Sequence, residues 1–242
     1  MPTSLVTGGS RGIGRAVALR LAAEGHDVAV GYGSNAAAAE KVADAVRALG
    51  RRAAAAGGDL ADPAAADTLV DAVEAELGPV DVLVANAGVN TPGRRVEEIS
   101  LEEWDRLHAV NLRAPFLLAR RVVPGMAARG FGRIVLLSSV AAYTGGIIGA
   151  HYASSKAGLH GLAHSLSQQA AGAGVTVNVV APALIESDML PADPEVREQL
   201  AGSLPVGRLG TADEVADLIA AVVRNGFVTN QSFLIDGGRH PT

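Results

Sequence analysis

The sequence predicts an α/β fold in which one doubly wound parallel sheet of seven strands carries helices on both faces. Short runs of β-branched and aliphatic residues alternate with longer Ala-rich stretches, and this alternation is typical of parallel strands joined by crossover helices. The length of 242 residues and the absence of an internal repeat or a linker-like segment favour one domain, residues 1–242, over two smaller ones.

The seven expected strands are short apolar runs. In chain order they span residues 4–7, 27–31, 52–56, 81–85, 133–138, 175–180 and 232–235. Helices are expected between them at residues 12–24, 35–49, 63–77, 101–128, 152–171 and 211–224, each long enough to cross the sheet. Asp62 and Thr211 are suitable N-cap residues, and Gly25, Gly50 and Gly78 stand where helices should end.

One long stretch, residues 181–210, shows no regular pattern and contains four prolines. A loop of this length in a compact domain is usually functional, so we expect residues 185–210 to form a substrate lid. Because such a lid would cover the substrate, it holds most of the information on substrate identity.

The composition excludes several classes of function. The chain has no cysteine, so disulfides, thiolate nucleophiles and Cys-based metal sites are absent, and a cytoplasmic protein is the default expectation. A formal net charge of −5 with 3% aromatic residues argues against a nucleic-acid surface. No apolar run reaches the ~18 residues of a membrane helix, and the first residues lack the pattern of a secretion signal. We therefore expect a small-molecule partner, with no nucleic acid and no membrane.

No metal site is expected either. His160 and His164 are four residues apart, which is a spacing that metal ligands use on helices. Gly161, however, stands where a zinc hydrolase would place its general-base glutamate, so these histidines are expected at the helix surface or at a subunit interface.

A glycine-rich turn joins the first expected strand to the first expected helix, with the spacing Gly-x3-Gly-x-Gly. Glycines let the backbone turn tightly and approach a pyrophosphate, while the following helix directs its free N–H groups at the phosphates. Strand, glycines and helix stand in the order of a Rossmann dinucleotide site, and a tight turn without a ligand is the alternative. The cofactor-binding residues expected here are Gly8, Ser10, Arg11, Gly12, Ile13 and Gly14.

Further cofactor contacts are expected after the third and fourth strands, because an open parallel sheet binds its ligand at the carboxyl edge. Asp59 is placed to accept a hydrogen bond from the adenine amino group, with Leu60 beside it. Asn86, Ala87 and Gly88 would let the adenosine ribose lie against backbone. Both segments are also typical turn sequences, which is the alternative interpretation.

The end of the second strand indicates the choice of cofactor. An acidic residue there would bind the 2′-hydroxyl of NAD and repel a 2′-phosphate, but the segment from Tyr32 through Ser34 to Asn35 contains no acid. Arg11 can reach a 2′-phosphate as a charge-assisted donor, and Ser34 or Asn35 can add neutral hydrogen bonds. We therefore expect NADPH (NADP⁺), with Tyr32 and Ser34 among its contacts; a solvated Arg11 without a cofactor role is the alternative.

Lysine is rare in this chain, which has only Lys41 and Lys156 among its 20 basic residues. Tyr152 precedes Lys156 by four residues on the same helix face, so the two form a candidate acid–base pair. A nearby ammonium, together with the positive nicotinamide ring of an oxidised cofactor, would stabilise the phenolate and bring proton exchange closer to neutral pH. Ser139 follows the fifth strand, where its hydroxyl would polarise a substrate carbonyl, and Ser138 competes for that role.

Asn111 lies in the long expected helix, four residues before Pro115. Pro115 lacks the N–H that would normally donate to the Asn111 carbonyl, which would leave this oxygen free to bind a water. A kink in the helix without a catalytic role is the alternative.

Together these motifs resemble the short-chain dehydrogenase/reductase family, and the resemblance covers essentially the whole chain. It is carried by Thr7-Gly8, Gly12-Ile13-Gly14, Asn86-Ala87-Gly88, Asn111, Ser139 and Tyr152-x3-Lys156. The resemblance implies that Ser139, rather than Ser138, is catalytic. It also implies that Lys156 binds the nicotinamide ribose and that Asn111 completes a proton relay through water.

Residues after the sixth strand share this resemblance. It implies that Pro182, Ile185 and the segment Glu186-Ser187-Asp188-Met189 contact the nicotinamide carboxamide and open the lid. Ala183 departs from the family, which usually has glycine after the proline, so a backbone angle comfortable only for glycine is not expected there.

Within the family, the glycine turn with Arg11, residues 152–158 and 178–182, and the ending 234–238 look most like 3-oxoacyl-thioester reductases. These reduce 3-oxoacyl groups on acyl carrier protein or coenzyme A in fatty-acid or polyketide synthesis. They commonly carry an Arg-Glu pair and a further basic residue where this chain has Gln168-Gln169 and Ala173, which puts carrier-protein docking in doubt. Arg129 and Arg133 could still meet an acidic carrier, or they are simply solvated.

Two other functions stay open. An NAD(P)-dependent dehydrogenase of a polyol, sugar acid or cyclic alcohol uses the same four catalytic residues, and a non-catalytic dinucleotide sensor uses the same fold. The helices at 101–128 and 152–171 are Ala- and Leu-rich around more of their circumference than a sheet face would bury, which predicts pairing between subunits. The family resemblance implies a homotetramer. His151, beside Tyr152, receives no role.

Overall fold

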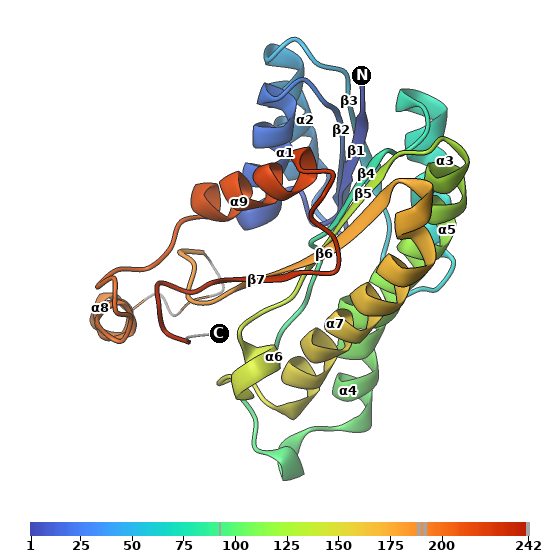
Figure 1. Cartoon of the computed structure of the whole chain (residues 1–242). Coiled ribbons are helices and arrows are strands. Elements are labelled where there is room, and N and C mark those ends of the chain that lie inside the picture. Colours follow the sequence, from blue (N-terminus) through green and yellow to red (C-terminus); the bar gives the residue numbers. More distant parts are fainter. Residues whose placement is uncertain (92, 188–189, 191–192, 241–242) are drawn as a thin grey trace.

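The computed structural model describes residues 1–242 apart from 92, 188–189, 191–192 and 241–242. In this described part, seven parallel strands form one sheet in the order β3-β2-β1-β4-β5-β6-β7 (Figure 1). The strands are Thr3–Val6 (β1), Asp27–Tyr32 (β2), Ala53–Gly57 (β3), Val82–Ala85 (β4), Gly132–Leu137 (β5), Val175–Pro182 (β6) and Ser232–Ile235 (β7). The chain extends the sheet from β1 to β3 on one side and then from β4 to β7 on the other, so the topological switch point lies between β1 and β4.

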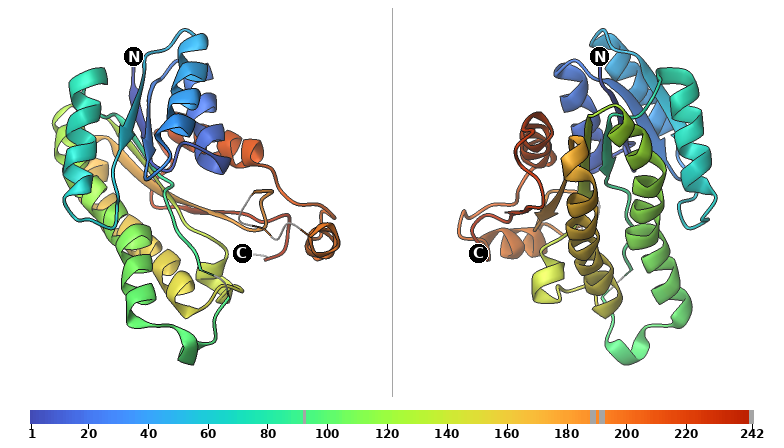
Figure 2. Two further views of the ribbon diagram at one scale, coloured as in Figure 1. Left: turned by 180° about the vertical axis from the view of Figure 1, so that it is seen from behind. Right: turned by 45° about the vertical axis from the view of Figure 1, so that its right-hand side comes forward.

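Helices cover both faces of this sheet (Figure 2). One face carries α1 (Gly12–Ala23), α2 (Ala36–Ala48) and α9 (Ala212–Arg224), and the other carries α3 (Ala65–Leu77), α5 (Ala114–Ala128) and α7 (Ala150–Ala170). Every residue of β1, β4 and β6 is buried between the two layers, which is why these strands are rich in aliphatic residues, although Thr3, Ser4, Thr176 and Asn178 are buried with them. The doubly wound α/β fold expected from the sequence is confirmed.

The long helix expected at 101–128 is interrupted. It consists of α4 (Leu101–His108), a π-helical turn (Ala109–Arg113) and α5, and Asn111 lies in the middle of the π-helical turn. Pro115 cannot donate a backbone hydrogen bond to the carbonyl four residues earlier, and a wider turn relieves this missing contact. A single continuous α-helix was therefore the wrong prediction here.

Residues 181–210 are more regular than the sequence suggested. Strand β6 extends to Pro182, and the helix α8 (Pro194–Gly202) occupies the centre of the stretch. The side chain of Asp193 caps α8 by accepting a hydrogen bond from the Glu195 N–H at 2.9 Å, and Pro194 occupies the first turn. An N-cap followed directly by proline is a helix-start signal, so the prediction of an irregular stretch was wrong.

Smaller differences concern helix ends. Helix α3 begins at Ala65 with Ala64 as its N-cap residue, so the prediction of Asp62 as N-cap was wrong; Asp62 instead accepts a hydrogen bond from the Ala64 N–H. Thr211 caps α9 as expected, in a reciprocal pair with Glu214. Helix α7 starts at Ala150, two residues before the expected start. Over the described ranges, no helix is long and apolar enough to cross a membrane.

Candidate active site

The glycine turn between β1 and α1 requires glycine at three positions for different reasons. Gly8 and Gly12 have positive φ angles of 63° and 52°, which other residues rarely adopt. A Cβ on Gly14 would lie 2.2 Å from the carbonyl oxygen of Gly8, so only glycine lets α1 pack this closely. A Cβ on Gly12 would instead point into open space, which leaves the backbone at the start of α1 free to receive a phosphate.

Asn86, at the end of β4, fastens this turn to the neighbouring strand. Its side-chain amide donates to the carbonyl oxygens of Thr7 at 2.8 Å and Gly8 at 3.2 Å. The Thr7 hydroxyl in turn accepts from the backbone N–H groups of Asn86 at 3.1 Å and Ala87 at 3.0 Å. The Asn86 side chain therefore has a structural role in shaping the turn, which the sequence interpretation missed, and its expected cofactor contact stays a prediction.

The residues expected to bind the adenosine half lie at the carboxyl ends of β2 and β3. Asp59 is exposed and uses one carboxylate oxygen to accept from the Ala61 N–H at 3.0 Å. Leu60 is buried in the core against α3, so its side chain belongs to the fold. The ring of Tyr32 lies against Gly57, where a Cβ would come within 2.8 Å of it.

The residues expected to select the 2′-phosphate are exposed. Arg11 precedes α1 in an extended conformation, and Ser34 follows β2. Asn35 is the N-cap of α2 and accepts from the Ala38 N–H at 2.9 Å, so its side-chain oxygen is already engaged. The structure thus brings Arg11 and Ser34 to the same edge of the sheet as the glycine turn. Ser10 and Ile13, in that turn, are half-buried.

Tyr152 and Ser139 meet at the carboxyl end of β5. The Ser139 hydroxyl accepts from the Ala141 N–H at 3.2 Å and lies near the Tyr152 phenol. Burial raises the pKa of the Tyr152 phenol, and the neighbouring Ser139 hydroxyl lowers it by less, so the pKa lies above its usual value of 10.0. The expected stabilisation of the phenolate by Lys156 together with an oxidised nicotinamide ring stays a prediction.

The ammonium of Lys156 lies close to Tyr152 and is held by the sheet. It is 5.9 Å from the centre of the Tyr152 ring and donates to the carbonyl oxygen of Leu137 at 2.8 Å. Lys156 is 4% exposed, and burial lowers its pKa from 10.5 to about 8. At neutral pH it is still charged, and its hydrogen bond fixes the ammonium at the end of β5, beside the phenol.

Ser138 has a different task from Ser139. Its hydroxyl is buried, donates to the carbonyl oxygen of Lys156 at 2.9 Å and lies 3.0 Å from Nε2 of His160. His160 also contacts the Ser232 hydroxyl at 2.9 Å through Nδ1. Ser138 thus joins α7 to the sheet, whereas Ser139 lies near the tyrosine, and the catalytic role that the family resemblance implies for Ser139 stays a prediction.

Both histidines with metal-ligand spacing are engaged in hydrogen bonds, His160 as above and His164 with the Asn230 side-chain oxygen at 2.5 Å. Within the part of the chain that the structure describes, no group of three or more His, Cys, Asp or Glu side chains is placed to hold a metal ion.

Asn111 ties the segment after β4 to the catalytic helix. Its side-chain oxygen accepts from the Val89 N–H at 2.8 Å, and its amide donates to the Val89 carbonyl at 2.9 Å and to the Ser155 hydroxyl at 3.2 Å. A Cβ on Gly88 would lie 3.4 Å from both the Asn111 oxygen and the Lys156 nitrogen. The absence of a side chain at Gly88 therefore leaves room beside these two groups.

The segment after β6 is held at two points. Ala183 donates to the carbonyl of Ile235 at 3.0 Å, and Ile185 pairs with Gly210 in an isolated parallel bridge. Asn230 is the one non-glycine residue with a positive φ in the described ranges, so Ala183 fits its position without strain. Of the segment expected to contact the carboxamide, residues 188 and 189 lie outside the described residues.

His151 is a further buried residue of this region that the sequence interpretation left without a role. It is fully buried in the first turn of α7, and its Nε2 lies 2.8 Å from the Thr91 hydroxyl. Its position next to Tyr152 was the only signal in the sequence.

The glycine turn and the acid–base residues lie at the same carboxyl edge, beside the topological switch point. Fold and site therefore define a dinucleotide-dependent oxidoreductase. The family profile described as short chain dehydrogenase matches residues 2–198, and the chain belongs to this family.

Similar proteins agree with this classification. The chain is 40% identical over 238 residues to an acetoacetyl-CoA reductase of Cupriavidus necator, with 97% of this chain and 96% of the relative covered. It is 37% identical over 240 residues to the 3-oxoacyl-[acyl-carrier-protein] reductase FabG of Escherichia coli K12, with 98% and 96% covered. A solved structure of a blue fluorescent protein from a metagenomic library, in complex with NADPH, matches with a TM-score of 0.90 at 38% identity and covers 99% of this chain and 98% of that chain. The family resemblance seen in the motifs is confirmed.

Proposed function

We propose that this protein is an NADPH-dependent ketoreductase that reduces a 3-oxoacyl thioester to the 3-hydroxyacyl thioester, in fatty-acid or polyketide synthesis. The observation that carries the proposal is the placement of the Ser139 hydroxyl near the Tyr152 phenol, with the Lys156 ammonium 5.9 Å from the tyrosine ring. The substrate class is supported by the two relatives, named as an acetoacetyl-CoA reductase and a 3-oxoacyl-[acyl-carrier-protein] reductase. The cofactor is supported by the NADPH complex of the similar solved structure.

The carboxyl edge of the sheet fits this cofactor. The open face of Gly12 at the start of α1 receives the pyrophosphate, and the exposed Arg11 and Ser34 receive the 2′-phosphate that distinguishes NADPH from NADH. The full set assigned to the cofactor is Gly8, Ser10, Arg11, Gly12, Ile13, Gly14, Tyr32, Ser34, Asp59, Leu60, Asn86, Ala87, Gly88, Tyr152, Lys156, Pro182 and Ile185.

Four side chains carry the chemistry. Ser139 and Tyr152 donate hydrogen bonds to the substrate carbonyl oxygen and polarise it. When bound, NADPH supplies the hydride that reduces the carbonyl carbon. Tyr152 gives its phenolic proton to the oxygen as negative charge develops there, and the raised pKa keeps this proton on the phenol until then. Lys156 stabilises the remaining phenolate. Asn111 holds Val89, in the segment after β4, and completes the relay that returns a proton to Tyr152.

The substrate lid is assigned to residues 185–210. The bridge between Ile185 and Gly210 closes the base of this segment, and α8 lies within it. A hollow of about 180 Å³ at this base is lined partly by the apolar side chains of Leu184, Leu204 and Val206. A segment that is held at its base by a backbone bridge, and whose hollow is lined partly by apolar side chains, is suited to close over an acyl chain.

Docking of an acidic carrier protein at Arg129 and Arg133 stays a prediction, and both arginines already have contacts within the chain. Arg133 lies at the start of β5, about 13 Å from the catalytic end of that strand at ~3.3 Å per residue. Its guanidinium donates to the carbonyls of Val223, Gly132 and Gly174, and Arg129 pairs with Asp81. We therefore propose that the thioester, whether on coenzyme A or on a carrier protein, enters from the side of the lid.

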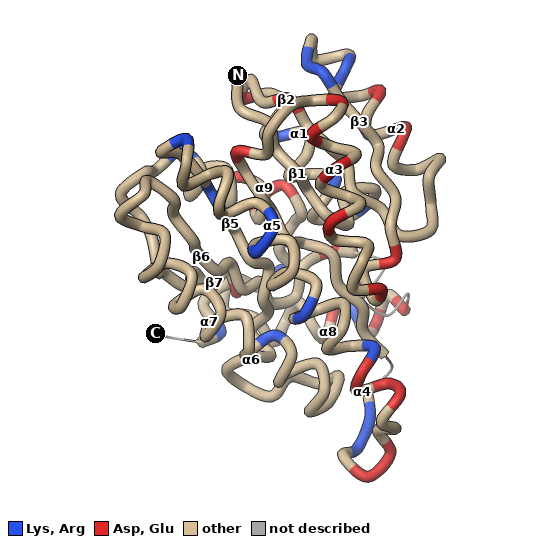
Figure 3. Tube along the Cα trace, turned by 90° about the vertical axis from the view of Figure 1, so that its right-hand side faces the viewer, with Lys and Arg blue, Asp and Glu red and all other residues tan. Residues whose placement is uncertain are grey.

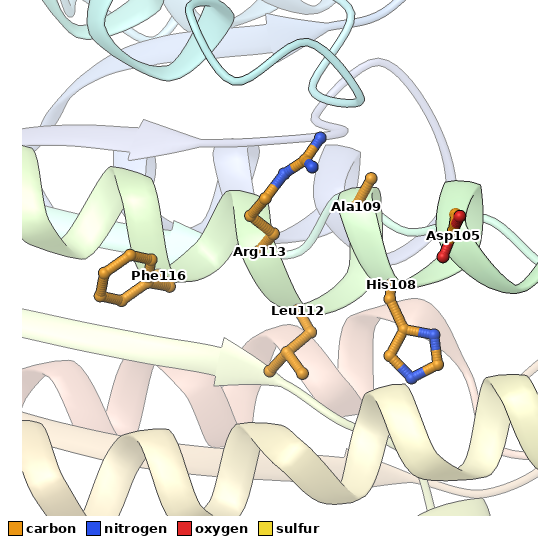
Figure 4. A pocket seen from close by; sticks show the side chains of 6 residues that line it. All are labelled: Asp105, His108, Ala109, Leu112, Arg113 and Phe116. Atoms are coloured by element: carbon orange, nitrogen blue, oxygen red, sulfur yellow. The ribbon is translucent and has the colours of Figure 1, made fainter.

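We further propose that the protein assembles as a homotetramer in the cytoplasm. Lys156 is the only charged residue of α7, so the exposed side of this long helix lacks charge, as the uncoloured stretch in Figure 3 shows. The surface of α4 and α5 has an open hollow of about 630 Å³ that Leu112, Phe116 and His108 line in part (Figure 4). The uncharged face of α7 favours pairing with a second copy of the chain, whereas the hollow on α4 and α5 is also lined by the charged side chains of Asp105 and Arg113. Light scattering coupled to size exclusion measures the mass directly.

The function is tested by the loss of nicotinamide absorbance with acetoacetyl-CoA, for the wild type and for Tyr152→Phe, with NADPH and then NADH. We expect turnover with NADPH and a loss of at least about 100-fold in Tyr152→Phe, while NADPH binding is retained. A wild type that binds NADPH but leaves the thioester untouched would refute the thioester assignment. Oxidation of a polyol or cyclic alcohol in the same plate would then identify a dehydrogenase, and no turnover at all would identify a dinucleotide sensor.

A further inference from the structure

We propose that His151 is a positioning residue that ties the segment after β4 to the first turn of α7 and thereby fixes Tyr152 for proton transfer. This inference rests on the proposed reductase function. Nε2 of His151 lies 2.8 Å from the hydroxyl of Thr91, which stands 60 residues earlier in the sequence, and the imidazole is completely buried.

The surrounding backbone is shaped to hold this ring. Gly149 has a φ of 135°, and a Cβ there would lie 3.0 Å from Cε1 and 3.1 Å from Nδ1 of His151 and 3.1 Å from the Arg94 carbonyl oxygen. The N–H of Arg94 donates to the carbonyl of Ile148 at 3.0 Å, so the two segments run alongside one another at this point. Glycine at 149 therefore makes room both for the imidazole and for the segment after β4.

Only one of the two ring nitrogens has a partner. Nδ1 of His151 is buried and makes no hydrogen bond within the described residues. An unpaired buried nitrogen costs free energy, so an apolar side chain would suit this place better if the ring served only to fill space. The one hydrogen bond to Thr91 is thus the feature that distinguishes histidine from an apolar residue here.

The hydrogen bond between His151 and Thr91 holds the residue before Tyr152, and a second set of hydrogen bonds holds a residue after it. The Ser155 hydroxyl donates to the Tyr152 carbonyl at 2.8 Å and accepts from Asn111, which also holds Val89. The residues before and after the tyrosine are therefore both fastened to the same segment after β4. Loss of the His151 contact frees the first turn of α7 and lets the phenol move relative to the substrate carbonyl, which lowers the rate of proton transfer.

The experiment compares His151→Phe, His151→Gln, His151→Asn and Thr91→Val, with Thr68→Val as the matched control. Thr68 lies on the exposed side of α3, where its hydroxyl contacts only the Ala64 carbonyl of its own helix. Measurements are kcat and KM for acetoacetyl-CoA, the Kd of NADPH, and amide hydrogen exchange of residues 86–98 and 147–156.

We expect His151→Phe and Thr91→Val each to lower kcat about tenfold, with an NADPH Kd within twofold of wild type and no change in Thr68→Val. The double variant should be no slower than the slower single variant, because both changes remove the same hydrogen bond. Gln places its amide nitrogen near the position of the imidazole Nε2, so His151→Gln should restore most of the rate, whereas the shorter Asn should not.

Unchanged kcat in both single variants, or losses that multiply in the double variant, would overturn the proposal. If His151→Phe does not fold, Thr91→Val with its control still decides. If the wild type does not reduce the thioester, the proposed function is refuted, but hydrogen exchange still tests whether His151 and Thr91 hold the two segments together. In that case faster exchange of both segments in His151→Phe and Thr91→Val supports it, and unchanged exchange refutes it.

Discussion

Lys156 is expected to lower the stability of the cofactor-free protein at neutral pH, and Lys156→Met should show by how much. The ammonium is 4% exposed, and the hydrogen bond that the structure gives it goes to a neutral partner, the carbonyl of Leu137. Burial lowers its pKa from 10.5 to about 8. At 1.36 kcal/mol per pKa unit, this difference corresponds to about 3 kcal/mol of penalty for keeping the charge inside the fold.

The penalty depends on pH in a direction that identifies it. Below pH 8 the lysine is charged in both states, and the folded state bears the full penalty. Between about pH 8 and pH 10.5 the unfolded chain still binds a proton that the folded protein has released, so the free energy of unfolding rises with pH. Relative to Lys156→Met, the wild type should gain about 3 kcal/mol across this window.

Methionine also removes the hydrogen bond to the Leu137 carbonyl, and a buried acceptor without its donor costs about 1–3 kcal/mol. Lys156→Met should therefore be between equally stable and about 2 kcal/mol more stable than the wild type at pH 7, while its turnover is lost.

Urea unfolding followed by circular dichroism, at pH values from 7 to 11 without cofactor, measures both quantities. Lys41→Met is the control, because Lys41 is exposed on α2 and its replacement should leave the pH dependence parallel to that of the wild type. Parallel curves for the wild type and Lys156→Met would refute the reasoning, because they would mean that the buried lysine titrates as in the unfolded chain.

Other substitutions test the site. Arg11→Ala should raise the Kd of NADPH at least about tenfold and leave that of NADH unchanged in fluorescence titrations, and equal weakening would contradict a 2′-phosphate contact. Ser139→Ala should lower kcat about 100-fold, whereas Ser138→Ala should mainly lower the melting temperature; the reverse would exchange their roles. Gly14→Ala should give no folded protein by circular dichroism, because its Cβ would lie 2.2 Å from a carbonyl oxygen. Burial lowers the pKa of His160, so the unfolded chain takes up a proton first as pH falls below 6.5, and the melting temperature should decrease more steeply in the wild type than in His160→Gln.

The elements that the sequence predicts correctly have short-range signals. The strands are rich in aliphatic residues because both sheet faces are buried, and the glycine turn shows its constraints within eight residues. The spacing of Tyr152 and Lys156 follows from helix geometry alone. In each case the physical cause and the pattern lie in the same segment, so sequence analysis finds them.

The pKa of Tyr152 could not be predicted in this way. Sequence spacing places an ammonium one turn away, which suggests a lowered pKa, but the sign depends on how deeply the phenol is buried. In the structure burial raises the pKa more than the neighbouring Ser139 hydroxyl lowers it. Burial depends on the folded structure as a whole and not on the spacing of residues in the sequence.

The functions that sequence analysis missed belong to side chains whose partners are far away along the chain. Asn86 holds the carbonyl of Thr7 across 79 residues, and Asn111 holds Val89 across 22. An asparagine after a strand is a common turn residue, and one before a proline suggests a kink, so the local pattern gives the ordinary explanation in both cases. Both side chains fasten an element of the carboxyl edge to another element, and removing either should change the position of the site without removing any group that reacts. A comparison of kcat with the Kd of NADPH in variants of this site should therefore distinguish the two asparagines. Loss of the Asn86 contact should first weaken cofactor binding, and loss of the Asn111 contact should first lower turnover.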